Sequence, residues 1–392
     1  MYSPFCTLWT GLQTCRERYI FTQEGATGSA YQFAHRAGNW RNTMKKLVVM
    51  LLAGVLLVTG LSGCGSKEDQ ETLYVYNWSE YMPQEVYDMF EEETGIRVVE
   101  KTFSSNEEML AKLVAGGSGQ YDLIVASNYV VNAMKEQNLI QPMDISKLEN
   151  FDNLADFVQG MSYDPENEYT VPYMSTITVI AYNKTMCEEL GVEINSLNDL
   201  LDPALENNLV VVDDCREIVD IALKATGKNP DSTDEAEISS AIDWLSQLAP
   251  NIKLYDSDTA FSALATNEVA AGIVYNMDAA IAIGENPDID VVYTEEPCEM
   301  SIDNFVLSSQ SQNVEAAHKF IDFILRPDVY KMCLDAFPAV CLNDAAKELL
   351  DDTYFNNAGA NLDEEEITRA HIINDVGDAA EYYDAVFSKM KN

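Results

Sequence analysis

The sequence predicts an α/β protein of two lobes, each built on a doubly wound sheet with helices on both faces. From residue 72 onward, short apolar runs typical of strands alternate with helical patterns. The runs 121–126 (YDLIVA) and 208–212 (NLVVV) are apolar at consecutive positions, which is typical of strands buried on both faces. The pattern covers about 320 residues, more than one hydrophobic core usually holds, so two lobes are expected.

The expected strands and helices follow one another in a regular order. A strand at 73–77 precedes a helix that begins at Pro83 and ends at Gly95, because proline is favoured at helix starts and glycine just past helix ends. Asn106 is the expected cap of the next helix. Later strands are expected at 96–103, 121–126, 178–183, 208–212, 270–276, 290–294 and 304–308, and later helices at 216–226 and 235–248.

A secretion signal stands near the start of the chain. Lys45 and Lys46 precede an apolar run at 47–61, which is shorter than the roughly 20 residues that a membrane-spanning helix needs. The following LSGC string, ending at Cys64, resembles a bacterial lipobox, in which the cysteine is acylated and becomes the mature N-terminus. The protein is therefore expected outside the cytoplasm of a bacterium, at the cell surface or in the periplasm, anchored to a membrane by lipid.

This signal divides the first part of the chain into three segments. Residues 1–43 are interpreted as a wrongly assigned start or a disordered extension, 44–63 as the lipoprotein signal peptide, and 64–71 as a short polar tether.

Charge limits the classes of partner. The chain has 65 acidic and 24 basic residues, a net charge of -41. Nucleic acids and anionic membrane surfaces would repel such a protein. The charge favours a cationic ligand, although it is also consistent with a role in solubility alone.

Cysteine and histidine positions argue against a disulfide framework and a metal centre. Outside the N-terminal segments there are five cysteines, an odd number, with no CxxC motif. Cys333 and Cys341 are the one candidate pair. The three histidines, at positions 35, 318 and 371, are scattered, so no zinc site and no cofactor are expected.

Carboxylates and aromatic rings recur at the ends of the expected strands, where ligands bind in open α/β sheets. Ammonium groups favour such surroundings, since carboxylates accept charge-assisted hydrogen bonds and aromatic faces attract cations. The candidate ligand-binding residues are Trp78, Ser79, Glu80, Tyr81, Ser127, Tyr129, Asp214, Glu217, Tyr275, Asp278 and Asp303. Trp78 and Tyr81 are also explained as core residues and most of the acidic candidates as residues of helix starts, so both interpretations stay open.

Several strings resemble the spermidine/putrescine-binding proteins, the substrate-binding components of polyamine ABC transporters. In chain order they are LYVYNWSEYMP (73–83), ETGIRV (93–98), YDLIVASNYVV (121–131), VVDDCREI (211–218), FILRPDVY (323–330) and NDVG (374–377). The resemblance implies a type II-like periplasmic-binding-protein fold, in which two lobes joined by crossover strands close on ligand like a flytrap. The implied limits are 72–176 plus 303–345 for lobe 1, and 177–302 plus 346–392 for lobe 2.

The resemblance also implies roles for the candidate residues. Residues 78–81 match the first binding motif, Asp214 and Glu217 an acidic pair of the second lobe, and Asp303 a carboxylate near a lobe crossover. The remaining candidates match further binding positions of the family, namely Ser127, Tyr129, Tyr275 and Asp278. The implied protein is a monomer without catalytic activity that delivers a small polyamine to permease subunits and their ATPase.

Three departures from the family pattern bear on the ligand. Ser301 stands where the spermidine binders have a tryptophan, Ile373 replaces a glutamine, and Phe337 replaces a tyrosine. Asp278 resembles an acidic position of putrescine-preferring members. These differences favour putrescine over spermidine.

Other functions remain to be weighed against this one. A secreted hydrolase with two catalytic carboxylates is one alternative, but the sequence has no G-x-S-x-G motif. A sensor that presents ligand to a receptor is another. A binding protein for a different organic cation, or for a metal or sugar, is the third.

Overall fold

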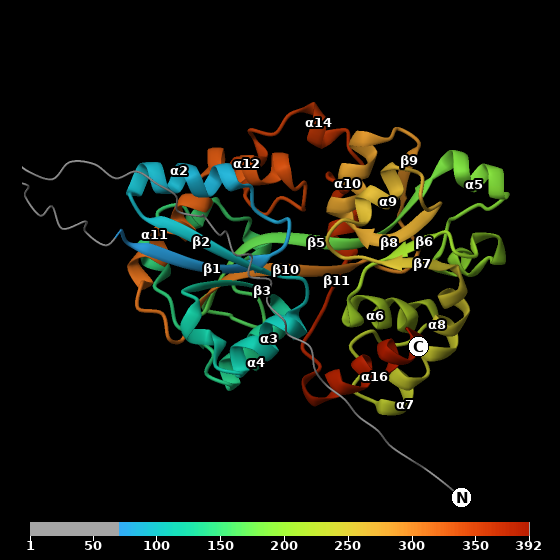
Figure 1. Cartoon of the computed structure of the whole chain (residues 1–392), viewed down its shortest axis with the longest axis horizontal. Helices are drawn as coiled ribbons and strands as arrows, with labels where there is room; N and C mark the ends of the chain where they lie inside the picture. Colours follow the sequence, from blue (N-terminus) through green and yellow to red (C-terminus); the bar gives the residue numbers. More distant parts are fainter. Residues whose placement is uncertain (1–69, 392) are drawn as a thin grey trace, which may run out of the picture. The chain divides into compact units, whose positions relative to one another are not determined.

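Residues 70–391 are the part of the chain that the computed structural model describes, and their strands form one mixed sheet (Figure 1). The predicted signal peptide and the lipidation site Cys64 lie outside the described residues. The strands are β1 (Thr72–Trp78), β2 (Arg97–Phe103), β3 (Leu123–Ser127), β4 (Ile140–Gln141), β5 (Thr170–Asn183), β6 (Leu209–Val211), β7 (Ile252–Tyr255), β8 (Ala271–Tyr275), β9 (Ile289–Val292), β10 (Glu299–Ser308) and β11 (His371–Ile372). Their order is β2-β1-β3-β10-β5-β8-β6-β7, with β4 and β11 paired to β10 and β9 paired to β5.

Helices cover both faces of this sheet. They are α2 (Gln84–Thr94), α3 (Asn106–Val114), α4 (Val131–Glu136), α5 (Lys184–Leu190), α6 (Cys215–Ala225), α7 (Glu235–Ser239), α8 (Ile242–Leu248), α9 (Ala260–Ala265), α10 (Asn276–Glu285), α11 (Val314–Ile324), α12 (Pro327–Ala336), α13 (Asp344–Lys347), α14 (Asp352–Phe355), α15 (Glu364–Arg369) and α16 (Ala380–Met390). Gly95 ends α2 in the left-handed conformation, with φ 74°. The next helix, α3, is capped by the Ser105 side chain, one residue before the expected cap Asn106.

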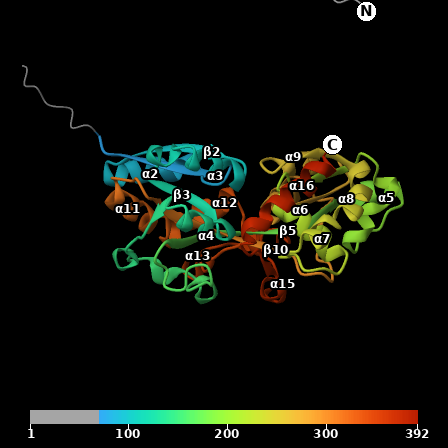
Figure 2. The same ribbon diagram turned by 90° about the horizontal axis from the view of Figure 1, so that it is seen from below.

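Strands β5 and β10 join the two groups of elements. They run antiparallel to each other; β10 also pairs with β3, and β5 also pairs with β8. Figure 1 shows both strands passing between the group that contains β1–β3 and the group that contains β6–β8, and the turned view in Figure 2 shows the same connection. The predicted two-lobed α/β fold with crossover strands is confirmed.

The crossing strand β5 begins eight residues earlier than the sequence predicts, at Thr170 instead of 178. Pro172 lies in this early part, and proline inside a run argues against a strand because it donates no hydrogen bond to the ladder. The structure accommodates it next to a register shift, where β10 has an irregularity between Asp303 and Asn304.

Three hydrophobic clusters leave a gap on one face of the sheet. One cluster, with side chains from α2 and α9 to α12, covers one face along both lobes. The opposite face has two separate clusters, one around α3 and α4 and one around α6, α8 and α16. The middle of β5 and β10 therefore carries polar side chains between these two clusters.

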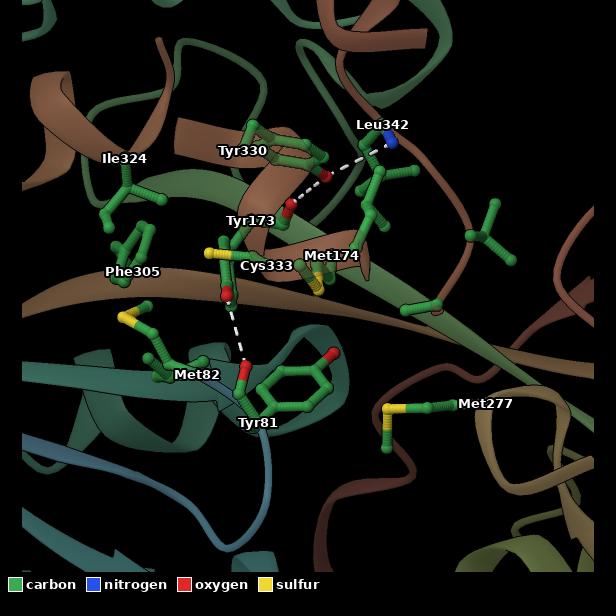
Figure 3. Close-up of a cluster of buried hydrophobic side chains, with 14 of the residues drawn as sticks. Tyr81, Met82, Tyr173, Met174, Met277, Phe305, Ile324, Tyr330, Cys333 and Leu342 are labelled. Atoms are coloured by element: carbon green, nitrogen blue, oxygen red, sulfur yellow. Dashed lines mark hydrogen bonds between the residues drawn. The ribbon is translucent and has the colours of Figure 1, made fainter. Parts of the chain in front are cut away.

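Figure 3 shows how the large continuous cluster holds the residues beneath the site. Tyr173 on β5 donates a 3.1 Å hydrogen bond to the carbonyl oxygen of Tyr81, and Tyr330 on α12 donates to the carbonyl oxygen of Tyr173. The Leu342 backbone N–H donates to the Tyr330 hydroxyl at 3.2 Å. This chain of hydrogen bonds through buried rings fixes the backbone at Tyr81.

Cys333 and Cys341, the candidate pair, are both free thiols in the structure. Cys333 lies in the buried core, and the Cys341 thiol donates to the carbonyl oxygen of Asn343. Within residues 70–391, no helix has the length and apolar character to span a bilayer, and no cluster of three or more potential metal ligands is found.

Candidate ligand-binding site

A pocket lies over the crossing strands, between the two separate hydrophobic clusters. It has about 500 Å³ of space, including the part open to solvent. Nine of the candidate residues line it: Trp78, Ser79, Tyr81, Ser127, Tyr129, Asp214, Glu217, Tyr275 and Asp303. They come from the ends of β1, β3 and β8, from β10, and from the start of α6. Segments that are distant in sequence thus meet where ligands bind in open α/β sheets, at the ends of the strands (the strand-end rule).

Asp303 is the carboxylate on the sheet side of the pocket. It is buried, with the Ser127 hydroxyl donating to its Oδ1 and the Tyr81 hydroxyl donating to its Oδ2, both at 2.7 Å. Burial raises the pKa of Asp303 to about 6, although these hydrogen bonds favour the ionised form. The carboxylate is therefore held in a fixed orientation and can accept further bonds from a cation.

Asp214 and Glu217 form the acidic side of the pocket at the start of α6. Asp214 caps the helix, because its Oδ1 accepts hydrogen bonds from the backbone N–H groups of Arg216 (2.9 Å) and Glu217 (3.1 Å). Glu217 accepts a 2.7 Å bond from the Thr178 hydroxyl. Burial, followed by the nearby charge of Asp214, raises the pKa of Glu217 well above its usual range. The cap explains the place of Asp214, and the same geometry points both carboxylates at the pocket.

The aromatic residues of the pocket are held by neighbours. The half-buried ring of Trp78 packs on Phe103, with the centroids 4.6 Å apart. The Tyr129 hydroxyl accepts a 2.6 Å bond from the Asn106 amide, and the Arg216 guanidinium lies 5.6 Å from the centre of its ring. Tyr129 therefore lies between residues of α3 and α6.

Two candidates do not line the pocket. Glu80 is exposed and its backbone is left-handed, with φ 49°, so it lies on the turn after β1. Asp278 is buried in the first turn of α10, where its Oδ1 accepts a 3.1 Å bond from the Phe261 backbone N–H. Burial raises the pKa of Asp278 to about 7. Glu80 follows Ser79 in sequence, but the turn directs its side chain to solvent and not into the pocket.

Six further residues line the pocket: Ser104, Thr176, Ser257, Asp258, Met277 and Ser301. The Ser104 hydroxyl, after β2, donates a 3.0 Å bond to Asp258, after β7, and so links two segments across the pocket. Both residues follow strand ends. Ser104 comes directly after the predicted strand 96–103, and Asp258 comes after β7, a strand that was not predicted from the sequence. Thr176 and Ser301 lie inside the crossing strands with their hydroxyls 3.0 Å apart. No local signal marks Thr176 as a site residue, whereas the family resemblance had already singled out position 301.

The pocket is suited to an organic cation. Its lining includes four carboxylates and four large aromatic rings. None of the lining residues found in the described part of the chain is a lysine, arginine or histidine. Carboxylates bind ammonium groups, and the rings can cover a methylene chain and attract its cationic ends by roughly 0.5–2 kcal/mol each.

Comparison with known proteins agrees with this chemistry. Residues 85–359 match the family described as bacterial extracellular solute-binding protein. The spermidine/putrescine-binding periplasmic protein of Salmonella typhimurium is 36% identical over 348 residues, which are 89% of this chain and 99% of that protein. A solved structure from Listeria monocytogenes, assigned to a spermidine/putrescine ABC transporter, is 31% identical with a TM-score of 0.78 and covers 82% of this chain and 99% of its own. The Tp0655 lipoprotein of Treponema pallidum is 29% identical, with a TM-score of 0.71 over 82% of this chain and 99% of its own.

Proposed function

Because the chain belongs to the bacterial extracellular solute-binding protein family, and the relatives compared above are binding proteins rather than enzymes, we propose that it captures a polyamine and delivers it to the permease of an ABC importer. The observation that carries this proposal is the composition of the pocket, which combines buried carboxylates with aromatic rings and no base. An alkylammonium ligand supplies the positive charges that this lining lacks.

Binding would couple the two lobes. One ammonium group is held by Asp303, which Ser127 and Tyr81 orient, and another by Asp214 and Glu217 at the start of α6. A ligand that contacts both sides stabilises the closed arrangement over an open one by the difference in contacts.

The preferred ligand in this proposal is putrescine rather than spermidine. Ser301 places a small hydroxyl, bonded to Thr176, on the pocket floor where an aromatic wall would otherwise cover a longer chain. Asp278 adds nothing to this argument, since it does not line the pocket.

The proposed location is outside the cytoplasm, with the protein anchored by lipid at Cys64. Two observations support it: the LSGC string at the end of the apolar run, and the names of the relatives, one a periplasmic protein and one a lipoprotein. Mass spectrometry of the mature protein tests the anchor, and an unmodified cysteine at position 64 would exclude it.

A thermal-shift screen tests the ligand. The Cys64→Ala protein, which cannot be acylated, is melted with putrescine, cadaverine, spermidine, spermine and single amino acids. A ligand that binds the native state raises the melting temperature by mass action, and at a concentration of 100 Kd the stabilisation is about 2.7 kcal/mol. Putrescine should give the largest shift. The absence of a shift with every amine would refute the proposed function.

A further inference from the structure

The floor of the pocket continues as a row of polar residues along β10. Glu299, Ser301 and Asp303 alternate along this strand and therefore face the same side of the sheet. Ser301 and Asp303 line the pocket, and Glu299 is the next residue in the row. Glu299 lies opposite Thr178 of β5, the residue whose hydroxyl holds Glu217.

Glu299 is a fully buried carboxylate whose partner is a lysine of the same protein. The Lys224 Nζ lies 2.9 Å from Glu299 Oε1, and its ammonium also donates to the carbonyl oxygen of Pro297. The Lys224 side chain is only 8% exposed. Among the described residues, Oε2 of Glu299 has no hydrogen-bond partner, so this acidic position is incompletely satisfied.

Lys224 reaches this position from the helix that carries the acidic side of the pocket. Glu217 and Lys224 are seven residues apart on α6, which places them on one face of the helix. A lysine side chain leans toward the N-terminus of its helix, and here that is toward Glu217. The ammonium of Lys224 therefore lies on the continuation of the pocket, beyond Glu217.

A second cavity neighbours the main pocket. It has about 310 Å³ of space, including its open part, and Thr178, Lys224 and Glu299 are among its lining residues. Thr178, which lines this cavity, donates a hydrogen bond to Glu217, which lines the main pocket. The acidic group of this cavity, Glu299, could bind an ammonium group of a ligand, but the ammonium of Lys224 already occupies that position.

We propose that Lys224 is a specificity-determining residue, whose ammonium occupies the position that a third amine of the ligand would take on Glu299. A diamine spans Asp303 and the Asp214–Glu217 pair, and the next carboxylate of the row is neutralised from within. Lys224 thus limits the length of the ligand, because its side chain fills the space beside Glu299 and its ammonium would repel a third amine. This inference rests on the proposed polyamine-binding function.

A purely structural role for the same ion pair predicts a different result. Glu299 also faces His371, with 3.9 Å between Oε2 and Nε2, and His371 lies 3.0 Å from Asp231. If Lys224 served only this buried network, its loss would lower stability and weaken every amine in the same proportion. If Lys224 limits the length of the ligand, its loss should instead change the affinity for spermidine, which has a third amine, more than the affinity for putrescine.

The test compares calorimetric affinities of the full chain for putrescine and spermidine. In Lys224→Ala, the ratio of spermidine to putrescine affinity should rise at least tenfold, because the cavity opens and Glu299 is free. The double variant Lys224→Ala/Glu299→Gln should return the ratio to that of the native protein. Lys253→Ala removes an exposed lysine that is paired with Glu268, and it should leave the ratio unchanged.

The affinity ratio in Lys224→Ala either supports or overturns the role of Lys224. A ratio that stays within threefold of the native value in folded Lys224→Ala overturns the inference. If this variant does not fold alone, it is refolded with each amine: spermidine should restore a cooperative melting transition and putrescine should not, and any other pattern overturns the inference. If the native protein binds no amine, the proposed function itself fails, whereas amine binding with an unchanged ratio rejects only the role of Lys224.

Discussion

The Tyr81 hydroxyl donates a 2.7 Å hydrogen bond to Asp303 Oδ2, joining the turn after β1 to the crossing strand β10. Tyr81 is itself held from behind, since its carbonyl oxygen accepts a bond from the Tyr173 hydroxyl. Ser127 holds the other oxygen of Asp303. The carboxylate is thus oriented before any ligand arrives, which reduces the entropy lost on binding.

Tyr81→Phe should lower amine affinity by about tenfold, since a hydrogen bond to a charged group contributes about 1.5–3 kcal/mol. The loss of the donor leaves the ionised Asp303 less stable and less well oriented. Isothermal calorimetry with putrescine at pH 8 measures the effect. Tyr354→Phe removes a hydroxyl that bonds to Ala339 outside the pocket and serves as the control. Equal affinities in both variants would show that Asp303 does not need this bond.

Asp303→Ala should reduce the affinity for every amine by at least tenfold, because one ammonium group loses its charged partner. Calorimetry on the folded variant measures this, with circular dichroism to confirm the fold. Glu80→Ala is the matched control, since Glu80 carries the same charge but lies outside the pocket lining. Unchanged affinity in Asp303→Ala would remove this residue from the site.

Amine affinity should fall as the pH is lowered through about 6. Burial raises the pKa of Asp303 to about 6, so a proton competes with the ammonium group below that pH, while the amine stays charged throughout. Glu217, whose pKa is also raised by burial, acts in the same direction. Titrations at pH 5 and pH 8 should differ at least tenfold in affinity. A flat profile would mean that neither carboxylate binds the ligand in its ionised form.

Asp278→Asn should stabilise the ligand-free protein at pH 8 but not at pH 5. The folded-state pKa of Asp278, about 7, lies above the ordinary aspartate value, so ionisation increasingly favours the unfolded state from about pH 4 to pH 7. The stability that the protonated group provides is present at low pH and is lost as the pH rises to about 7. Asparagine keeps the oxygen that accepts from Phe261. The gain at pH 8 should be about 1–3 kcal/mol, below the roughly 4 kcal/mol set by the pKa shift, because the new amide lacks a partner. Thermal melts at both pH values measure it, and equal gains at both would contradict the titration of Asp278.

The sequence indicated the fold and most of the pocket because both depend on local patterns. Consecutive apolar residues such as those of β3 predict a buried strand, and the residue after a strand end lies at the ligand edge of the sheet. Thr176 was beyond this reasoning, since it lies inside a strand and meets Ser301 only through the antiparallel pairing of β5 and β10. The same limit applies to Lys224, whose partner Glu299 is 75 residues away. Glu80 also follows β1, but its left-handed backbone and exposed side chain place it outside the pocket lining.

Ser301→Trp should raise the affinity for spermidine relative to putrescine by about three- to thirtyfold. Ser301 lies on the pocket floor between Asp303 and Glu299, where an indole ring would cover the additional methylene groups of a triamine and attract its charge. Calorimetry with both amines gives the ratio. Ser301→Ala, which removes only the hydroxyl bonded to Thr176, separates the loss of that bond from the gain of a ring. If the alanine and tryptophan variants show the same ratio, the small residue at position 301 does not determine which amine the pocket prefers.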